Sequence, residues 1–253
     1  MATGQTPGVM RPPLEVRQLH THEEFEQAVR LQRIIWGFEE IELLPVRLFV
    51  VASKVGGHAF GAFDGDMMVA FCLAIPGLKS GGGIYLHSHM LGVLKEYRDR
   101  GLGRILKLAQ RDEALPRGIR LMEWTFDPLE LKNAYFNIER LGAVIRRYVL
   151  NQYGTTTSHL HGGLPTDRCV AEWYIADQRV TNLLAGGTLE RRPVVARISL
   201  PNNIGELRKT DPKQARSLQQ AASKQFLEYF SQGLEVTAFE RSSDTGTYLF
   251  TEP

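Results

Sequence analysis

The stretch 85–107, YLHSHMLGVLKEYRDRGLGRILK, decides how this chain folds. It begins as a strand and ends in a helix expected over about 101–113, with a turn of arginines and glycines between them. A helix N-terminus carries unpaired N–H groups and partial positive charge, and glycine lets a phosphate come close to them. The turn therefore predicts a pyrophosphate site. Its expected members are Arg98, Arg100, Gly101, Leu102, Gly103 and Arg104.

Outward from this stretch, strands and helices alternate. Thr21 and Glu24 form a capping box at the start of a helix that ends near Gly37. Asp64 and Gly65 predict a hairpin turn, because both tolerate positive φ. The expected strands span 14–19, 58–63, 67–75, 85–93, 121–126 and 143–153, and the expected helices 22–36, 101–113 and 131–141; residues 46–53 suit either state, and 76–83 form a glycine-rich loop. This order predicts an α+β fold of mixed α/β type.

The chain divides into three expected parts. Residues 1–13 form a flexible N-terminal segment, and residues 14–165 form the unit that holds the pyrophosphate turn. Residues 166–253 form a C-terminal α+β extension packed on that unit, with a helix over about 211–232. Strands near 236–239 and 248–250 end the chain; their exposed edges can pair between subunits, which makes a homodimer an expectation.

Composition excludes several classes of protein. The 253 residues carry a net charge of +2 and are 43% hydrophobic, which disfavours disorder and gives no sign of nucleic acid or membrane as a partner. Cys72 and Cys169 form no CxxC pair, and His159 and His161 have no third ligand nearby, so no metal is expected. There is no apolar signal core, so the expected location is the cytoplasm.

The spacing Arg98, Gly101, Gly103 reads RxxGxG, and neither a P-loop nor a GxGxxG motif is present. It resembles the Q/R-x-x-G-x-G/A acyl-CoA signature of the GNAT superfamily of N-acyltransferases. The resemblance covers roughly 14–154 and is strongest over 85–142. It implies a mostly antiparallel central sheet flanked by helices, and acetyl-CoA or another acyl-CoA as cofactor. It also implies that pantetheine pairs with the strand backbone at Leu91, Gly92 and Val93.

The resemblance implies direct attack of an amine on the thioester, which needs a base. Alternation places His87 and His89 on one strand face, together with Leu91 and Val93. The run HSHMLGV resembles the strand of serotonin N-acetyltransferases in which two histidines relay the proton. Glu123 is the alternative base, because ribosomal-protein N-acetyltransferases carry a glutamate on the corresponding strand.

The acid that protonates the leaving thiolate is less clearly marked. The run NAYFNIERLGA resembles the YEKLGF-like helix end on which the family carries a tyrosine, but Ile138 occupies the usual tyrosine position. Tyr135, about one turn earlier, or a water molecule would then serve. Asn133 is expected to hydrogen-bond pantetheine.

The acceptor is expected to be a small amine or an amino acid. Trp36 and Phe38 supply an aromatic wall next to acidic residues. A carboxylate of the acceptor would be held by arginines, either Arg168 and Arg179 or Arg146 and Arg147.

The run TFDPLELKNAYFNIERLGA also resembles a branch of predicted acyltransferases of similar two-part length. Some relatives of that branch are associated with N-succinylation of amino acids, so succinyl-CoA is an alternative donor. Three other functions stay open. They are a protein Lys or N-terminal acetyltransferase, a non-catalytic CoA-binding module, and a nucleotide-binding protein that uses the Gly101 turn.

Overall fold

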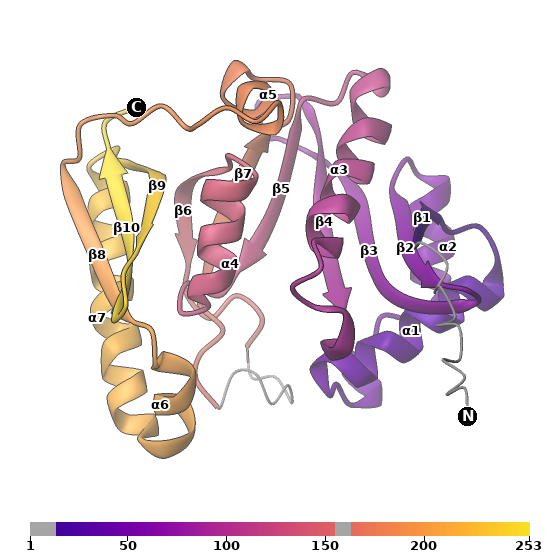
Figure 1. Cartoon of the computed structure of the whole chain (residues 1–253), viewed down its shortest axis with the longest axis horizontal. Helices are drawn as coiled ribbons and strands as arrows, with labels where there is room; N and C mark the ends of the chain where they lie inside the picture. The colour runs from indigo at the N-terminus through magenta and orange to yellow at the C-terminus, as the bar shows by residue number, and fades with distance from the viewer. Residues whose placement is uncertain (1–13, 155–162) are drawn as a thin grey trace, which may run out of the picture.

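The computed structural model describes residues 14–154 and 163–253 (Figure 1). The expected segment 1–13 and the pair His159 and His161 lie outside the described residues. The strands are β1 (Glu15–Gln18), β2 (His58–Asp64), β3 (Met67–Leu78), β4 (Ile84–Val93), β5 (Leu121–Phe126), β6 (Val144–Val149), β7 (Arg168–Tyr174), β8 (Ala196–Pro201), β9 (Glu235–Arg241) and β10 (Thr245–Thr251). They form one sheet in the order β1-β2-β3-β4-β5-β7-β6-β9-β10-β8.

Seven α-helices of the described chain surround this sheet. They are α1 (His22–Trp36), α2 (Val46–Lys54), α3 (Leu102–Ala114), α4 (Leu131–Tyr135), α5 (Gln178–Leu184), α6 (Ile204–Thr210) and α7 (Pro212–Ser231). A π-helical turn, Phe136–Arg140, prolongs α4. The strands pair antiparallel except for β4 with β5, which are parallel. The expected mixed α/β fold with a mostly antiparallel sheet is confirmed.

Local sequence signals explain where these elements begin and end. The Thr21 hydroxyl accepts a hydrogen bond from the Glu24 N–H at 3.2 Å, and the Glu24 carboxylate accepts one from the Thr21 N–H at 3.0 Å. This is the predicted capping box. Gly37 ends α1 with φ 69°, and Gly65 turns the β2–β3 hairpin with φ 60°. Both angles are ones that glycine adopts without steric cost.

The structure decides one open assignment and corrects two predicted strand ends. Residues 46–53 are helical, as part of α2, because their buried Phe49 and Ala52 recur at helical spacing. The strand β3 runs three residues beyond Ile75 and includes Pro76. Proline is tolerated there because β2 pairs with β3 only as far as Ala74. The strand β6 ends at Val149, where a turn begins.

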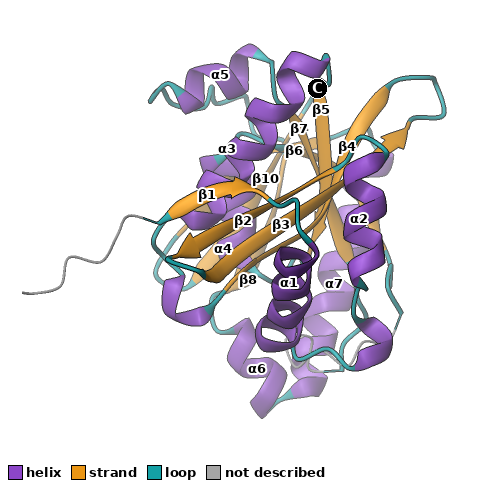
Figure 2. Cartoon of the chain, turned by 90° about the vertical axis from the view of Figure 1, so that its right-hand side faces the viewer, coloured by secondary structure: helices purple, strands orange, loops and turns teal. Residues whose placement is uncertain are grey.

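The helices cover opposite faces of the β1–β4 region (Figure 2). On one face α1 and α2 bury Phe25, Leu31 and Phe49 against β2 and β3. On the other face α3 buries Leu102 and Leu106 against the same strands. These strands are therefore covered by helices on both of their faces, which isolates them from water.

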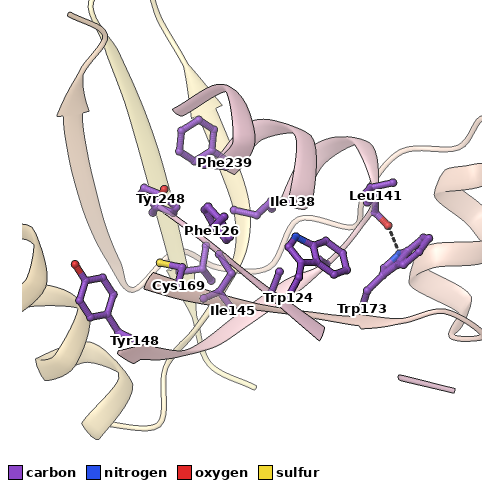
Figure 3. Packing of buried hydrophobic residues seen from close by; sticks show 14 of the residues in the cluster. Trp124, Phe126, Ile138, Leu141, Ile145, Tyr148, Cys169, Trp173, Phe239 and Tyr248 are labelled. Atoms are coloured by element: carbon purple, nitrogen blue, oxygen red, sulfur yellow. Dashed lines mark hydrogen bonds between the residues drawn. The ribbon is translucent and has the colours of Figure 1, made fainter. Parts of the chain in front are cut away.

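The sheet continues across the predicted domain boundary at residue 165. The strand β7, from the predicted extension, pairs with β5 on one side and with β6 on the other. Aromatic side chains from both parts share one core (Figure 3), in which Phe226 stacks on Tyr148 at 4.9 Å between ring centroids. The Tyr248 hydroxyl donates to the Pro128 carbonyl at 2.6 Å. The two parts therefore share one sheet and one hydrophobic core. The position of a domain boundary between them stays a prediction.

Candidate active site

The strands β4 and β5 form a fork. They pair only at Leu86 with Met122 and at His87 with Glu123, and then move apart (Figure 1). We call the diverging part, residues 88–93 of β4 and 124–126 of β5, the β4/β5 fork. In the described chain the β5-facing edge of β4 has no strand partner over 88–93, which leaves backbone groups there for an extended ligand.

A β-bulge shapes β4 at the start of the fork. Ser88 pairs with Ala74 and Met90 with the adjacent Leu73, so His89 is an extra residue on its strand. The rings of His87 and His89 lie 5.7 Å apart, which confirms that they point the same way. Alternation with Ser88, which is bonded to α3, places them on the opposite face, the side of α1 and α2.

The bulge also overturns one prediction. Leu91 and Val93 pack against Leu102 and Leu106 of α3, on the face opposite to the histidines. The expectation that all four β4 residues share one face was wrong, because the inserted residue reverses the alternation after His89.

Burial keeps both histidines neutral. Burial, assisted by the neighbouring His89 and opposed by Glu123, lowers the pKa of His87 to about 4. Burial also lowers the pKa of His89. At neutral pH both rings therefore have a nitrogen lone pair that can accept a proton.

The predicted pyrophosphate turn has the form of an anion cradle. Gly101 caps α3 with φ 79° and no side chain caps this helix end. A Cβ on Gly103 would lie in the space between the Leu91 side chain, at 3.7 Å, and Phe136, at 3.9 Å. The N–H groups at the start of α3 and the glycine surfaces beside them fit a pyrophosphate.

The arginines around this turn differ in what they already bind. Arg98 donates from Nε to the Val93 carbonyl at 3.1 Å, and thus joins the turn to the end of β4. The Arg100 guanidinium lies 4.9 Å from the centroid of the Tyr97 ring. Both side chains are exposed, while Arg104 is half-buried in the first turn of α3. The set can supply positive charge to a phosphate.

Glu123 is buried and already engaged. Its carboxylate accepts from Lys79 of the β3–β4 hairpin, and from Arg147 Nη2 at 2.6 Å. A proton on Glu123 would cost it both charge-assisted contacts, which makes it a poorer candidate base than the histidines.

Glu123 belongs to a charged ladder that crosses four strands and ends at Lys79 on one side and Arg192 on the other. Arg147 also bonds Glu172 at 3.1 Å, and Arg146 bonds Glu172 at 2.9 Å and Glu235 at 2.5 Å. A bulge in β6 at Arg146 places both arginines on one face. The full ladder consists of Lys79, Glu123, Arg147, Glu172, Arg146, Glu235 and Arg192.

The arginines predicted to hold an acceptor carboxylate therefore have protein partners. Arg146 and Arg147 are neutralised within the ladder. Arg179 donates to the Gly142 carbonyl at 3.0 Å, and Arg168 donates to the Asp167 carbonyl at 2.9 Å. The sequence showed the arginines but not their glutamates, which lie on strands far apart in the chain.

The helix α4 does not present a tyrosine to α3. The Arg241 guanidinium of β9 lies 5.1 Å from the centroid of the Tyr135 ring. Phe136 is the residue that approaches Gly103, and Ile138, in the usual tyrosine position, is fully buried in the core. Asn133 is exposed in the first turn of α4.

The predicted aromatic wall exists at the end of α1. Trp36 and Phe38 stack with ring centroids 5.7 Å apart and an angle of 16° between planes. A Cβ on Gly92 would lie 2.7 Å from the Trp36 indole, so Gly92 leaves room for this ring to reach β4. Trp36 thus lies on the face that also carries the two histidines.

Two further features concern metal and membrane. Within residues 14–154 and 163–253, no three His, Cys, Asp or Glu side chains come together as metal ligands. Among the described helices, none has the length and apolar character needed to cross a membrane.

Comparison with known proteins identifies the fold. No protein-family model matches the chain, and no curated protein matches its sequence. The structure of NAA60 from Arabidopsis thaliana in complex with acetyl-CoA is 16% identical, with a TM-score of 0.53 over 65% of this chain and 99% of that one. FeeM, an N-acyl amino acid synthase from uncultured soil microbes, is 15% identical, with a TM-score of 0.52 over 69% and 98%.

A structure from Desulfovibrio desulfuricans, described as an acetyltransferase of the GNAT family, is 14% identical, with a TM-score of 0.51 over 64% and 99% of the two chains. All three identities are too low to carry more than the architecture. The chain therefore has the fold of the GNAT superfamily of acyl-CoA-dependent N-acyltransferases.

Proposed function

We propose that this protein is an acyl-CoA-dependent N-acyltransferase that moves an acetyl or succinyl group to the amine of a small molecule or amino acid. One observation carries the proposal: the β4/β5 fork leads from the uncapped start of α3 to the histidine pair. The pyrophosphate of acyl-CoA would bind Gly101, Gly103 and the arginines of the turn. Its pantetheine arm would follow the free edge of β4.

The reaction we propose is direct transfer. The amine nitrogen bonds to the acyl carbon, and the bond from that carbon to sulfur breaks. His89 or His87 accepts the proton that the amine loses, because both rings are neutral and lie on the α1 side of the sheet, where we place the acceptor. Glu123 instead orders the ladder and, through its pairing with His87, the base of the β4/β5 fork.

The acceptor would bind on the α1 side of the sheet. Trp36 and Phe38 offer an aromatic surface there, which suits an amine with an apolar part. Arg146 and Arg147 are already paired with glutamates of the ladder. The ladder therefore offers the acceptor a polar surface, but neither guanidinium is left to bind a carboxylate of the acceptor. FeeM, named as an N-acyl amino acid synthase, supports an amino-acid acceptor by its similarity alone.

Binding and transfer test the proposal in turn. Calorimetry and thermal shift with acetyl-CoA, succinyl-CoA, free CoA and ATP should show stabilisation by the CoA species and none by ATP. Release of the CoA thiol should then be followed with L- and D-amino acids, simple amines and short peptides. Peptides as the best acceptors would favour a protein acetyltransferase, and binding without transfer to any amine would favour a CoA-binding module.

Two further points belong to the same proposal. We place the protein in the cytoplasm, where CoA thioesters are at hand. The last two strands do not expose the expected edges, because β10 pairs with both β9 and β8, and β9 also pairs with β6. We propose instead that a homodimer forms through the outer edge of β8, which ends the sheet, and analytical ultracentrifugation tests this.

A further inference from the structure

A buried lysine lies at the base of the β4/β5 fork. Lys107 projects from α3 and is only 3% exposed. Its ammonium donates to the Ser88 hydroxyl at 2.7 Å and lies 3.6 Å from the centroid of the Trp124 indole. Ser88 in turn donates to Gln110 at 2.9 Å. Lysine is rarely buried without a pairing partner, so its presence here needs an explanation.

The contacts of Lys107 place it where the strands part. Ser88 follows the last paired residue of β4, and Trp124 follows the last paired residue of β5. The ammonium therefore bridges the first two unpaired positions of the fork. An extended arm that follows β4 from the glycine turn must end there, because beyond this point the strands are joined.

Nothing permanently negative faces the ammonium. In the described chain no carboxylate forms an ion pair with Lys107, and burial lowers its pKa to about 7. Cys72 of β3 is a neutral thiol, since burial raises its pKa to about 12. His58 of β2 and His87 of β4 have lowered pKa values and are neutral. Negative charge that develops at the fork would find one unneutralised cation.

We propose that Lys107 is the general acid that protonates the CoA sulfur as the acyl–sulfur bond breaks. The inference rests on the proposed N-acyltransferase activity. The electron pair of the broken bond stays on sulfur, and a proton moves from Lys107 Nζ to that sulfur. The products are free CoA thiol and a neutral Lys107 amine, which takes a proton from water when CoA leaves.

The chemistry matches the group. A thiol ordinarily ionises near pH 8.5, so an ammonium whose pKa is about 7 gives its proton to a thiolate downhill. The assignment also accounts for α4, where Ile138 is buried and Tyr135 lies under Arg241. The acid comes from the opposite helix, α3, and serves the same reacting bond.

Ionisation of bound CoA tests the inference without any acceptor. The ultraviolet absorbance of the thiolate would be titrated for CoA bound to the wild type and to Lys107→Met, with bound desulfo-CoA as the blank. A Lys107 ammonium that loses its proton near pH 7 is already neutral where a thiol ionises, so the bound thiol should ionise at about the same pH in the wild type and the variant, whereas a permanent cation beside the sulfur would lower that pH in the wild type by about one to three units. Lys132→Met, the same change at an exposed lysine of α4, should match the wild type.

The outcomes separate the two proposals. Thiol ionisation at a much lower pH in the wild type than in Lys107→Met would overturn the role of Lys107 as the proton donor while CoA binding stands. Failure of the wild type to bind CoA would instead remove the proposed function, and this inference with it. Since Met keeps the apolar stem and removes a buried charge, the variant is expected to fold.

Kinetics give a second readout with the best acceptor of the panel. Loss of a general acid should lower kcat of Lys107→Met by about 100-fold or more, with the KM for acetyl-CoA little changed. The alkaline fall of kcat in the wild type should disappear in the variant. A variant with unchanged kcat and an unchanged alkaline limb would overturn the assignment.

Discussion

The sheet opens twice, and the two openings are filled differently. Besides the β4/β5 fork, β6 and β9 pair only at Ile145 with Val236, and we call the region around this pair the β6/β9 junction. The junction is closed by the protein's own apolar side chains (Figure 3). The fork instead holds the polar set Ser88, Lys107 and Gln110, in which Gln110 Nε2 has no partner in the described chain.

This contrast indicates that the β6/β9 junction serves stability and that the β4/β5 fork serves function. Apolar closure of an opening stabilises the fold in proportion to the area it buries. A buried cation with hydroxyl and aromatic neighbours does not stabilise the fold in this way, because no counter-ion offsets the cost of its desolvation. The junction therefore joins the C-terminal part to the rest, and the fork is kept open and polar for a ligand.

The largest effect is expected at the junction. Phe226 of α7 is fully buried, and its ring stacks on Tyr148 and meets the edge of Tyr248 at 5.0 Å. Phe226→Ala leaves a cavity and should lower the free energy of unfolding by about 3–5 kcal/mol, measured by chemical denaturation. Lys107→Met, the matched change at the fork, should lower it by less than about 1 kcal/mol or raise it. Equal losses at both sites would contradict the division of roles.

The second effect concerns the base at the fork. His89→Gln should lower kcat by about 100-fold or more, whereas Glu123→Gln should act mainly through stability. On the acid side, the wild-type kcat/KM should fall as pH drops through about 4, because protonation of His87 then removes a proton acceptor from the pair. If Glu123→Gln abolishes turnover and His89→Gln does not, the base is the carboxylate.

The third effect compares two glycines at helix starts. Gly103 is the second residue of α3, and Gly205 is the second residue of α6, where a Cβ would meet nothing within 4 Å. Gly103→Leu fills the cradle and should weaken CoA binding by about tenfold or more in calorimetry, with the fold retained. Gly205→Leu should leave CoA affinity unchanged. Unaltered affinity in Gly103→Leu would refute the pyrophosphate assignment.

Local signals in the sequence predicted most of the GNAT core. The capping box at Thr21, the glycine turn at Gly101 and the strand at 121–126 all depend on residues close together in the chain, and all were confirmed. The bulges at His89 and Arg146 were not predictable in this way. A bulge is set by the register between strands, and no residue type marks it in a single sequence.

The polar interior of the fork was missed for a different reason. Lys107 lies three and seven residues before Gln110 and Ala114, the spacing of a buried helical stripe. That pattern would have placed it inward, but lysine is ordinarily read as a solvent-facing residue. The glutamates of the ladder, Glu172 and Glu235, come together only through the order of β7, β6 and β9 in the sheet.

The smallest effect is the pH dependence that Lys107 imposes on stability. Its pKa in the folded protein, about 7, lies below the ordinary value of 10.5. Between these values the unfolded chain binds a proton that the folded chain has released, so this group makes stability rise with pH. The slope is about 1.4 kcal/mol per pH unit, and it vanishes below about pH 7, where both states are protonated.

This slope can be isolated by chemical denaturation of the wild type and Lys107→Met between about pH 7 and 9, a range that lies below the ionisation of tyrosine. Other titrating groups are common to both proteins and cancel in the difference. The free energy of unfolding of the variant, relative to that of the wild type, should therefore fall as pH rises. A constant difference across this range would mean that Lys107 keeps its proton when folded. The fork would then hold a permanent cation, able to stabilise a thiolate but not to protonate it.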